Sequence, residues 1–230
     1  MRTPILFLLV AASNSTSIAN SATSSNHNLA MGAIMTTPTM QGYIPIRNWK
    51  TLRDNQVVKQ ALDYSCGAAS LATLLNYYYG QNITETDILK AMDKSEDRAS
   101  FADMAQAVNK FGFKANGFAV SWGQLKNLRV PVLLYLRNRR DDHFVILRGI
   151  SEHTVWVADP SLGNRTYSRE QFLALWETRK DQPNPELAGK FLAVIPLDAK
   201  TSIQENFFTE APRRQSANAV QQLLFSSVPP

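Results

Sequence analysis

Apolar residues recur at helical spacing in a segment that opens with the cysteine at position 66. The spaced apolar positions are Leu71, Leu74, Leu75 and Tyr78. Gly80 supplies a C-terminal stop signal, so the pattern predicts a helix with Cys66 at or just before its N-terminus. The residues directly after Cys66 are small, which leaves room for another molecule beside the thiol.

Capping signals predict several more helices, because a Ser or Thr with an acidic or amide residue three positions on can pair with the helix backbone. Such pairs open segments 84–92, 100–111 and 168–176, and a short piece after position 121. The pairs are Thr84 with Asp87, Ser100 with Asp103, Ser121 with Gln124, and Ser168 with Gln171.

β-prone apolar segments dominate the second half of the chain. They span 131–136, 143–150, 154–158 and 191–197. The connection at 151–153 is short, so the second and third segments should form a hairpin, and Pro160 ends the third one. A helical lobe followed by an antiparallel sheet is an α+β arrangement.

The chain begins with the layout of a secretory signal peptide. Met1-Arg2 precedes a short apolar run at 5–12 and then small and polar residues. Cleavage after Ala19, or nearby at Ser21 or Ala22, would leave an exported and therefore periplasmic protein. The run is too short to cross a membrane, and no transmembrane segment is expected in the mature chain.

The sequence patterns together divide the chain into four predicted segments. We expect a signal peptide at 1–22, a flexible leader at 23–45, one domain at 46–198 and a partly disordered tail at 199–230. In the tail, apolar residues at 219–224 have helical spacing and could form a docking helix.

Composition narrows the function classes. A chain of 230 residues with 44% hydrophobic residues can bury the core of one domain. Its formal charge of +5 comes from scattered basic residues, which indicates a solvated surface and no nucleic-acid partner. Neither a zinc-ligand pattern nor a nucleotide-binding fingerprint occurs, so no metal and no cofactor is expected.

The cysteine count makes Cys66 conspicuous. It is the only cysteine in the sequence, so in an exported protein it has no intramolecular disulfide partner. A helix N-terminus favours the thiolate, which is the attacking form of cysteine. The alternative is a buried structural cysteine, which more often lies in mid-helix. We therefore predict that Cys66 is a nucleophile.

A general base for this thiol is found in the predicted hairpin. His143 starts one strand and Asp159 closes the other, so both should lie at the same end. The aspartate would hold the second ring nitrogen of the histidine. Asp141 or Asp142 could orient the ring instead.

Two other histidines compete for the role of base. His153 falls at the opposite hairpin end, and His27 falls in the leader, so both are disfavoured. Gln60 precedes Cys66 by six positions. Its side-chain amide, together with the Cys66 backbone N–H, could form an oxyanion hole.

These residues carry a family resemblance. The segments that begin at Gln60 (QALDYSCGAASLATLL), at Asp142 (DHFVIL) and at Val157 (VADP) resemble the C39 family of cysteine peptidases, which process double-glycine and bacteriocin-type leaders. The resemblance covers about residues 57–197. It implies a papain-like fold with a Cys66 nucleophile, a His143 base, an Asp159 orienter and a Gln60 oxyanion donor. Ser65 stands where many members have aspartate, which bears on specificity and efficiency.

The layout of the whole chain refines this resemblance. No transporter part accompanies the domain, so the chain is similar to the stand-alone exported C39-like proteins of bacterial functional-amyloid (Fap) systems. This implies cleavage of a secreted polypeptide after a Gly-Gly or small-residue site, in support of amyloid secretion or assembly and biofilm formation. The implied partners are fibre subunits or their export machinery.

Two other function classes remain open from the sequence. One is a papain-like binding or chaperone module whose thiol site is vestigial, since a fold does not guarantee activity. The other is a cysteine amidase, transferase or cell-wall hydrolase that uses the same residues on a different acyl donor.

Overall fold

The computed structural model describes residues 32–37, 40–45, 49–93, 98–137, 142–179, 183–184 and 186–212. The predicted signal peptide and the predicted docking helix at 219–224 lie outside these residues. The chain divides into two compact units, 1–46 and 47–230. The second unit contains all of the sequence features that predicted a catalytic site.

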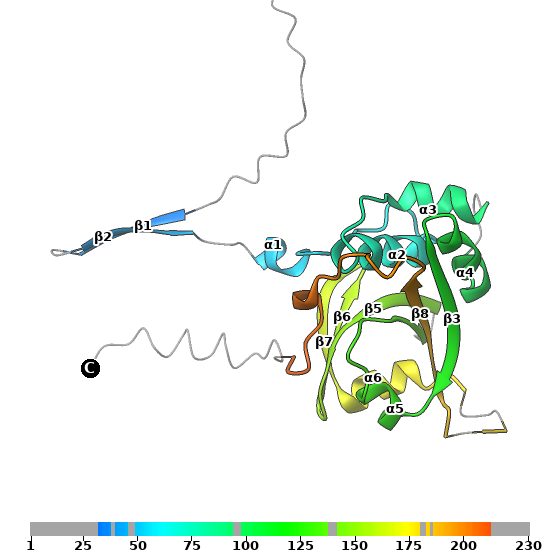
Figure 1. Ribbon diagram of the computed structural model, residues 1–230. Coiled ribbons are helices and arrows are strands. Elements are labelled where there is room, and N and C mark those ends of the chain that lie inside the picture. Colours follow the sequence, from blue (N-terminus) through cyan, green and yellow to red (C-terminus); the bar gives the residue numbers. More distant parts are fainter. Residues whose placement is uncertain are drawn as a thin grey trace, which may run out of the picture. The chain divides into compact units, whose positions relative to one another are not determined.

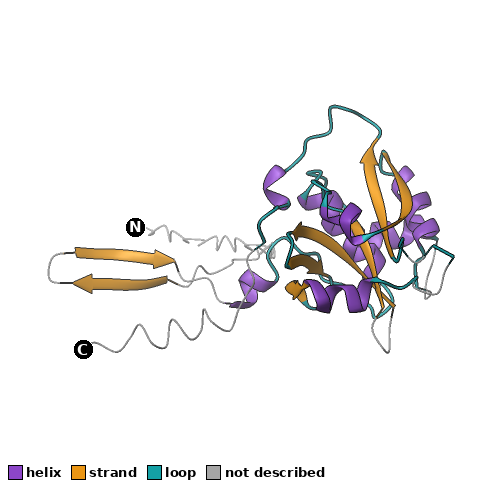
Figure 2. Ribbon diagram, turned by 90° about the horizontal axis from the view of Figure 1, so that it is seen from below, coloured by secondary structure: helices purple, strands orange, loops and turns teal. Residues whose placement is uncertain are grey.

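The first unit contains a hairpin in the segment that the sequence assigned to a flexible leader. Strands β1 (Gly32–Thr37) and β2 (Met40–Pro45) pair antiparallel, with Gly32 opposite Pro45 and Thr37 opposite Met40. Figure 2 shows the two strands running in opposite directions. A two-stranded hairpin is marginally stable by itself in water, so a sequence without a sustained alternating pattern gives little signal for it.

The second unit is built around a six-stranded sheet with the order β3-β8-β4-β5-β6-β7. The strands are β3 (Phe113–Val120), β4 (Leu133–Arg137), β5 (Asp142–Ile150), β6 (Thr154–Asp159), β7 (Gly163–Ser168) and β8 (Gly189–Pro196). All of the paired neighbours in this sheet are antiparallel. The predicted β5–β6 hairpin is present, with Ile146 opposite Ala158.

Helices cover both faces of this sheet. The helices are α1 (Trp49–Arg53), α2 (Cys66–Tyr77), α3 (Glu85–Met92), α4 (Phe101–Asn109), α5 (Trp122–Lys126) and α6 (Arg169–Trp176). Figure 1 shows α2, α3 and α4 above the sheet and α5 and α6 below it. All four predicted capping boxes are formed, at the N-termini of α3, α4, α5 and α6.

The period of two along a strand divides the core into two layers. In β4, Leu133 and Tyr135 pack with α2, α3 and α4, whereas Leu134 and Leu136 pack with α5 and α6. Helix α2 lies so deep that every residue from 66 to 75 is buried. It ends as predicted before Gly80, whose φ of +65° is a backbone conformation that other residues rarely adopt.

The polypeptide after β8 continues to pack against the domain, although the sequence assigned it to a tail from position 199. Phe207, in the 3₁₀ helix η1 (Glu205–Phe207), is fully buried beside Tyr78. The backbone N–H of Thr209 donates to the Arg148 carbonyl at 2.9 Å, and the N–H of Ile150 donates back to the Thr209 carbonyl at 3.3 Å. The packed domain thus extends to about residue 212.

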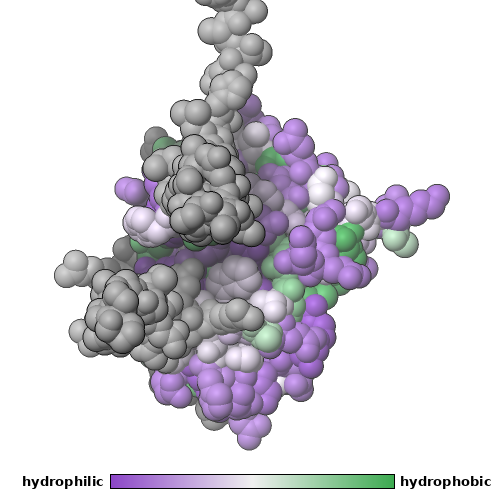
Figure 3. Space-filling view, turned by 90° about the vertical axis from the view of Figure 1, so that its left-hand side faces the viewer, coloured by the Kyte–Doolittle hydropathy of each residue, from purple (hydrophilic) through white to green (hydrophobic). Residues whose placement is uncertain are grey.

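One face of the surface is mainly polar where it can be seen. Figure 3 shows the face that lies on the left in Figure 1; where grey atoms leave it visible, hydrophilic residues predominate and hydrophobic ones form separate small areas. In the part of the chain that the structure describes, we find no helix that combines the length and the apolar character of a membrane span.

Candidate active site

Cys66 is the first residue of α2, and Ser65 is the N-cap. The hydroxyl of Ser65 donates to the Leu62 carbonyl at 2.7 Å and accepts from the Leu62 N–H at 3.2 Å, so it fixes the turn that leads into the helix. Only 4% of the Cys66 surface is exposed. The predicted position of the thiol at a helix N-terminus is therefore what the structure has.

A hydrogen bond ties α2 to the strand that carries His143. The Ser70 hydroxyl, one turn into the helix, donates to the Phe144 carbonyl at 3.0 Å. There is no free space for a side chain at Gly67. A Cβ there would lie 3.1 Å from the Met104 sulfur and 3.4 Å from the Phe144 ring. The absence of a side chain at Gly67 therefore lets α2 pack closely against Met104 of α4, while the Ser70 hydrogen bond holds α2 to β5.

The structure brings His143 and Asp159 together as the hairpin predicted. The Nε2 atom of His143 lies 3.0 Å from Oδ1 of Asp159, whose side chain is 3% exposed. Because Asp159 takes Nε2, the other ring nitrogen, Nδ1, is the one available to the Cys66 thiol. A carboxylate in this position holds the ring orientation and stabilises the imidazolium form.

The pKa values of the three groups fit a charged pair. Burial alone would raise the pKa of the Cys66 thiol, but hydrogen bonding to His143 and to backbone groups lowers it below its ordinary value. Burial would lower the pKa of His143, but its bonds to Asp159 and Cys66 raise it to about 9. At neutral pH the arrangement favours a thiolate beside an imidazolium.

The turn after β6 keeps Asp159 ionised. Burial opposes this, but the bond to His143 and the backbone N–H groups of Ser161 and Leu162 lower the pKa of the carboxyl. Those two N–H groups donate to Oδ1 at 2.8 and 2.9 Å. The turn closes at Gly163, whose φ is +82° and where a Cβ would lie 2.6 Å from the Asp54 carboxylate.

Asp142 and His153 are the alternatives for these roles that the structure describes. Asp142 is exposed and forms an ion pair with Arg137 at 3.4 Å, and His153 lies in the turn at the far end of the β5–β6 hairpin. Asp141 and His27 lie outside the described residues. Of the aspartates that the structure describes, Asp159 is the one bonded to the His143 ring.

Gln60 lies beside the Asp159 turn. Its backbone N–H donates to the Pro160 carbonyl at 3.1 Å, and its side-chain oxygen accepts from the Ser161 hydroxyl at 2.6 Å. Its amide nitrogen donates to the Leu62 carbonyl at 2.9 Å. An amide nitrogen carries two hydrogens, and this bond uses one of them.

Sequence reasoning missed the residue that holds the Gln60 segment in place. The backbone N–H of Ala61 points at the carboxylate of Glu85, with both oxygens 3.1 Å away. Glu85 is the first residue of α3 and is 9% exposed. Its position in the capping segment that begins at Thr84 gave no sign of this contact. The same is true of Ser70, which in sequence looks like any small helical residue.

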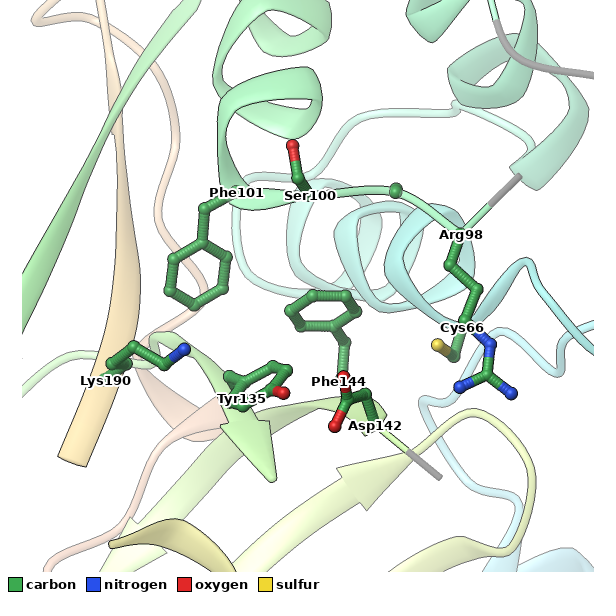
Figure 4. Close-up of a pocket in the computed structure, with 9 residues that line it drawn as sticks. Cys66, Arg98, Ser100, Phe101, Tyr135, Asp142, Phe144 and Lys190 are labelled. Carbon is green, nitrogen blue, oxygen red and sulfur yellow. The ribbon is translucent and has the colours of Figure 1, made fainter. Parts of the chain in front are cut away.

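A cavity of about 340 Å³ opens at the Cys66 thiol (Figure 4). Three aromatic rings line it, with centroids 5.5 Å apart for Phe101 and Phe144 and 5.6 Å apart for Tyr135 and Phe144. Figure 4 shows these rings between Cys66 and Arg98 on one side and Lys190 on the other. The Lys190 ammonium lies 3.9 Å from the Tyr135 ring centroid. The cavity therefore has an apolar floor and a charged rim next to the thiol.

Metal chemistry has no candidate in this part of the chain. Within the described ranges, no group of three or more His, Cys, Asp or Glu side chains could hold a metal ion.

Comparison with known sequences adds independent information. Residues 54–179 match the model of the peptidase C39 family. A protein of Pseudomonas fluorescens with the name "Probable functional amyloid protease FapD" is 30% identical over 178 residues, which cover 71% of this chain and 79% of that protein. The protein of the same name from Pseudomonas aeruginosa is 31% identical over 141 residues, which cover 58% of this chain and 62% of that protein.

Two solved structures resemble this chain. The peptidase domain of Streptococcus ComA, a bi-functional ABC transporter, has a TM-score of 0.52 at 19% identity and covers 61% of this chain and 97% of that one. A double-glycine motif protease from an AMS/PCAT transporter, in complex with a leader peptide, has a TM-score of 0.51 at 24% identity and covers 61% and 90%. These likenesses confirm the predicted α+β, papain-like fold of C39 peptidase domains.

Proposed function

The chain belongs to the peptidase C39 family of cysteine peptidases, and from this premise we propose that it cleaves secreted polypeptides with Cys66 as the nucleophile. His143 acts as base and acid, Asp159 orients it, and Gln60 donates to the oxyanion. The main support for the proposal is the arrangement of three side chains. The buried Cys66 thiol lies at a helix N-terminus, and the His143 imidazole lies 3.0 Å from the Asp159 carboxylate.

The first chemical step forms an acyl-enzyme. The Cys66 thiolate attacks the carbonyl carbon of the peptide bond, a C–S bond forms, and the carbonyl electron pair moves to oxygen. The backbone N–H of Cys66 and the Gln60 amide donate to that oxyanion. When the intermediate collapses, the C–N bond breaks and the His143 imidazolium gives its proton to the leaving amine.

The second step releases the acyl half. Neutral His143 takes a proton from water, and the resulting hydroxide attacks the thioester carbon. The C–S bond breaks, a carboxylic acid leaves, and the site returns to a Cys66 thiolate beside a His143 imidazolium. Asp159 stabilises the charged ring in both steps, since its buried carboxylate is ionised.

The proposed cleavage site follows a Gly-Gly or small-residue pair. Similarity to a double-glycine motif protease supports this choice, and so do the low exposure of the thiol and the close packing of the next residue, Gly67. Cys66 is 4% exposed, and Ala99 and Phe144 pack closely around Gly67. A substrate backbone without side chains can approach such a buried sulfur most closely.

We also propose export and a role in functional-amyloid secretion or assembly. The signal-peptide pattern at 1–22 and the likeness to two proteins named functional amyloid proteases support this. On this proposal the mature enzyme is periplasmic, with residues 46–212 as its peptidase domain. Its substrate would be a fibre subunit or a component of the export system.

The proposal can be tested by incubating wild type and Cys66→Ala with glycine-rich secreted polypeptides and reading the fragments by mass spectrometry. We expect cleavage after a Gly-Gly or small-residue pair in the wild type alone. Labelling by iodoacetamide serves as a parallel measure of the thiolate. If Cys66 is labelled but no polypeptide is cut, the amidase or transferase alternative gains; if neither occurs, the site is vestigial.

A further inference from the structure

A second cavity lies beside the His143–Asp159 pair. Its volume is about 240 Å³, and both His143 and Asp159 line it. Most of its other walls are apolar or aromatic. These walls are Leu136, Leu162, Tyr167 and Leu175. Ser161 also lines the cavity, and its backbone N–H supports Asp159. The mechanism proposed above thus uses the polar members and leaves the apolar ones without a role.

Each of the two cavities is lined by a different member of the Cys66–His143 pair. Cys66 lines the first cavity together with the Phe101, Tyr135 and Phe144 rings, whereas His143 lines the second. In acyl transfer, the half of the substrate before the cleaved bond stays on the sulfur. The half after that bond leaves as an amine that must receive its proton from His143. Chemistry therefore assigns the first cavity to the acyl half and the second to the leaving half.

The apolar walls are held in register with the reacting groups. Leu136 in β4 lies directly opposite His143 in β5. Leu162 is placed by its own backbone N–H, which donates to Oδ1 of Asp159 at 2.9 Å. The turn that gives His143 its carboxylate thus also presents an apolar side chain to the cavity.

Leu162 is the wall that a substrate can reach most readily. It is 49% exposed, although it is a large apolar residue in a turn next to a buried ion pair. Exposure of such a side chain costs free energy unless another apolar group covers it. A bound residue that enters this cavity would cover Leu162 and contact Leu175 and Tyr167 behind it.

We propose that this cavity binds the first residue after the cleaved bond and selects an apolar side chain there. The inference rests on the proposed function and extends it to the leaving half of the substrate. A volume of about 240 Å³ suits one residue, not a folded partner. Asp159 disfavours an acidic side chain at the same place, because its ionised carboxylate forms part of the wall.

The surface beyond Leu162 allows the leaving half to continue. Leu162 also lines a neighbouring hollow together with Trp49 and Leu52, which are 70% and 50% exposed. This hollow also contains Arg53 and Arg165, so a chain that leaves the first position would meet a surface of apolar and basic residues. The occupant that fits both hollows is the extended polypeptide after the cleaved bond.

The experiment uses peptides that are identical up to Gly-Gly and carry Leu, Ala or Asp as the next residue. We would measure kcat/KM for each peptide with the wild type, Leu162→Ser, Leu162→Lys and the control Leu197→Ser. Leu197 is a matched control because it is 62% exposed and does not line the cavity. The rate of Cys66 alkylation by iodoacetamide is measured in each protein as a readout of the thiolate that needs no substrate.

The wild type should cleave the Leu peptide at least about tenfold faster than the Asp peptide. Leu162→Ser should remove most of that preference, and Leu162→Lys should shift it towards Asp. Alkylation should stay constant in both variants, and Leu197→Ser should behave as the wild type. Circular dichroism of each variant verifies that the fold is kept.

Two results would overturn the inference, and they differ in what else they affect. Cleavage of all three peptides at equal rates, or an equal loss for all three in the Leu162 variants, rejects the cavity as a specificity site and leaves the peptidase function intact. No cleavage of any peptide by a protein whose Cys66 is still alkylated rejects the proposed function, and the inference falls with it.

Discussion

The Nε2 atom of His143 lies 3.0 Å from Oδ1 of Asp159, at the common end of β5 and β6. This contact decides which ring nitrogen can serve the thiol, because it leaves Nδ1 for Cys66. It also explains why the pKa of His143 is raised to about 9 despite burial, since the charged ring gains a buried carboxylate partner.

Removal of the base should change how Cys66 titrates. In His143→Ala the largest cause that lowers the thiol pKa is lost, while burial and the backbone hydrogen bonds remain, so the pKa should rise above that of the wild type. The rate of alkylation by iodoacetamide, measured from pH 5 to 10, should then be low at neutral pH and rise only in the alkaline range. His153→Ala, at the other end of the hairpin, is the control. An unchanged profile in His143→Ala would exclude His143 as the partner of the thiol.

The pH at which activity is lost on the alkaline side should depend on Asp159. Cleavage needs a protonated His143, so the wild-type rate should fall as pH rises through about 9. Asp159→Asn removes one of the two contacts that raise this pKa, the other being with Cys66, so the limb should move down towards the ordinary histidine value of about 6.5. At pH 7 a ring with a pKa of about 6.5 is roughly one-quarter protonated, so the loss of the charged form alone should lower the rate by up to about fourfold.

Asp142→Asn is the matched control, because Asp142 precedes His143 and pairs with Arg137. It should keep the alkaline limb of the wild type. A shift in Asp142→Asn with none in Asp159→Asn would reverse the assignment of the orienting carboxylate.

A catalytic role of the Gln60 amide can be distinguished from a structural role by two substitutions. If its amide donates to the oxyanion, Gln60→Ala should lower kcat by about 100-fold or more while alkylation of Cys66 is unchanged. Ser161→Ala removes the hydroxyl bonded to the Gln60 oxygen but leaves the amide N–H groups, so its effect should be much smaller. Equal small losses of kcat in the two variants would show that Gln60 only supports the Asp159 turn.

The segment after β8 should contribute to stability. Phe207 is fully buried, so Phe207→Ala should lower the free energy of unfolding by about 3–5 kcal/mol, measured by urea denaturation. Phe118→Ala makes the same chemical change at a side chain that is 47% exposed, and it should cost less. Equal costs for the two would favour a domain that ends at position 198, as predicted from the sequence.

Elements with strong local signals could be predicted from the sequence. The capping pairs at Thr84, Ser100, Ser121 and Ser168 depend on side chains three positions apart, so they carry their own evidence. The helix that begins at Cys66 and the β5–β6 hairpin were also correct within a few residues. The relation between His143 and Asp159 followed from the hairpin, because strand pairing fixes which ends meet.

Elements whose structure depends on distant partners could not be predicted. Strand β3 contains Asn116 and Gly117 and shows no clean alternation of buried and exposed residues, yet it pairs along its whole length with β8. Strand β7 is polar and lies at the edge of the sheet. Phe207 gave no periodic signal, because its burial depends on Tyr78 and Arg148, which are remote in sequence.

A covalent bond between Cys66 and the substrate can be detected directly as an added mass on the protein. Wild type mixed with a peptide that contains one Gly-Gly site is quenched with acid during turnover, and the intact protein is weighed by mass spectrometry. We expect an added mass equal to the peptide half that ends in Gly-Gly, located on Cys66. This mass should be removed by hydroxylamine and should be absent in Cys66→Ala. Cleavage at the same rate in Cys66→Ala, or turnover by a wild type that never carries this mass, would contradict this expectation.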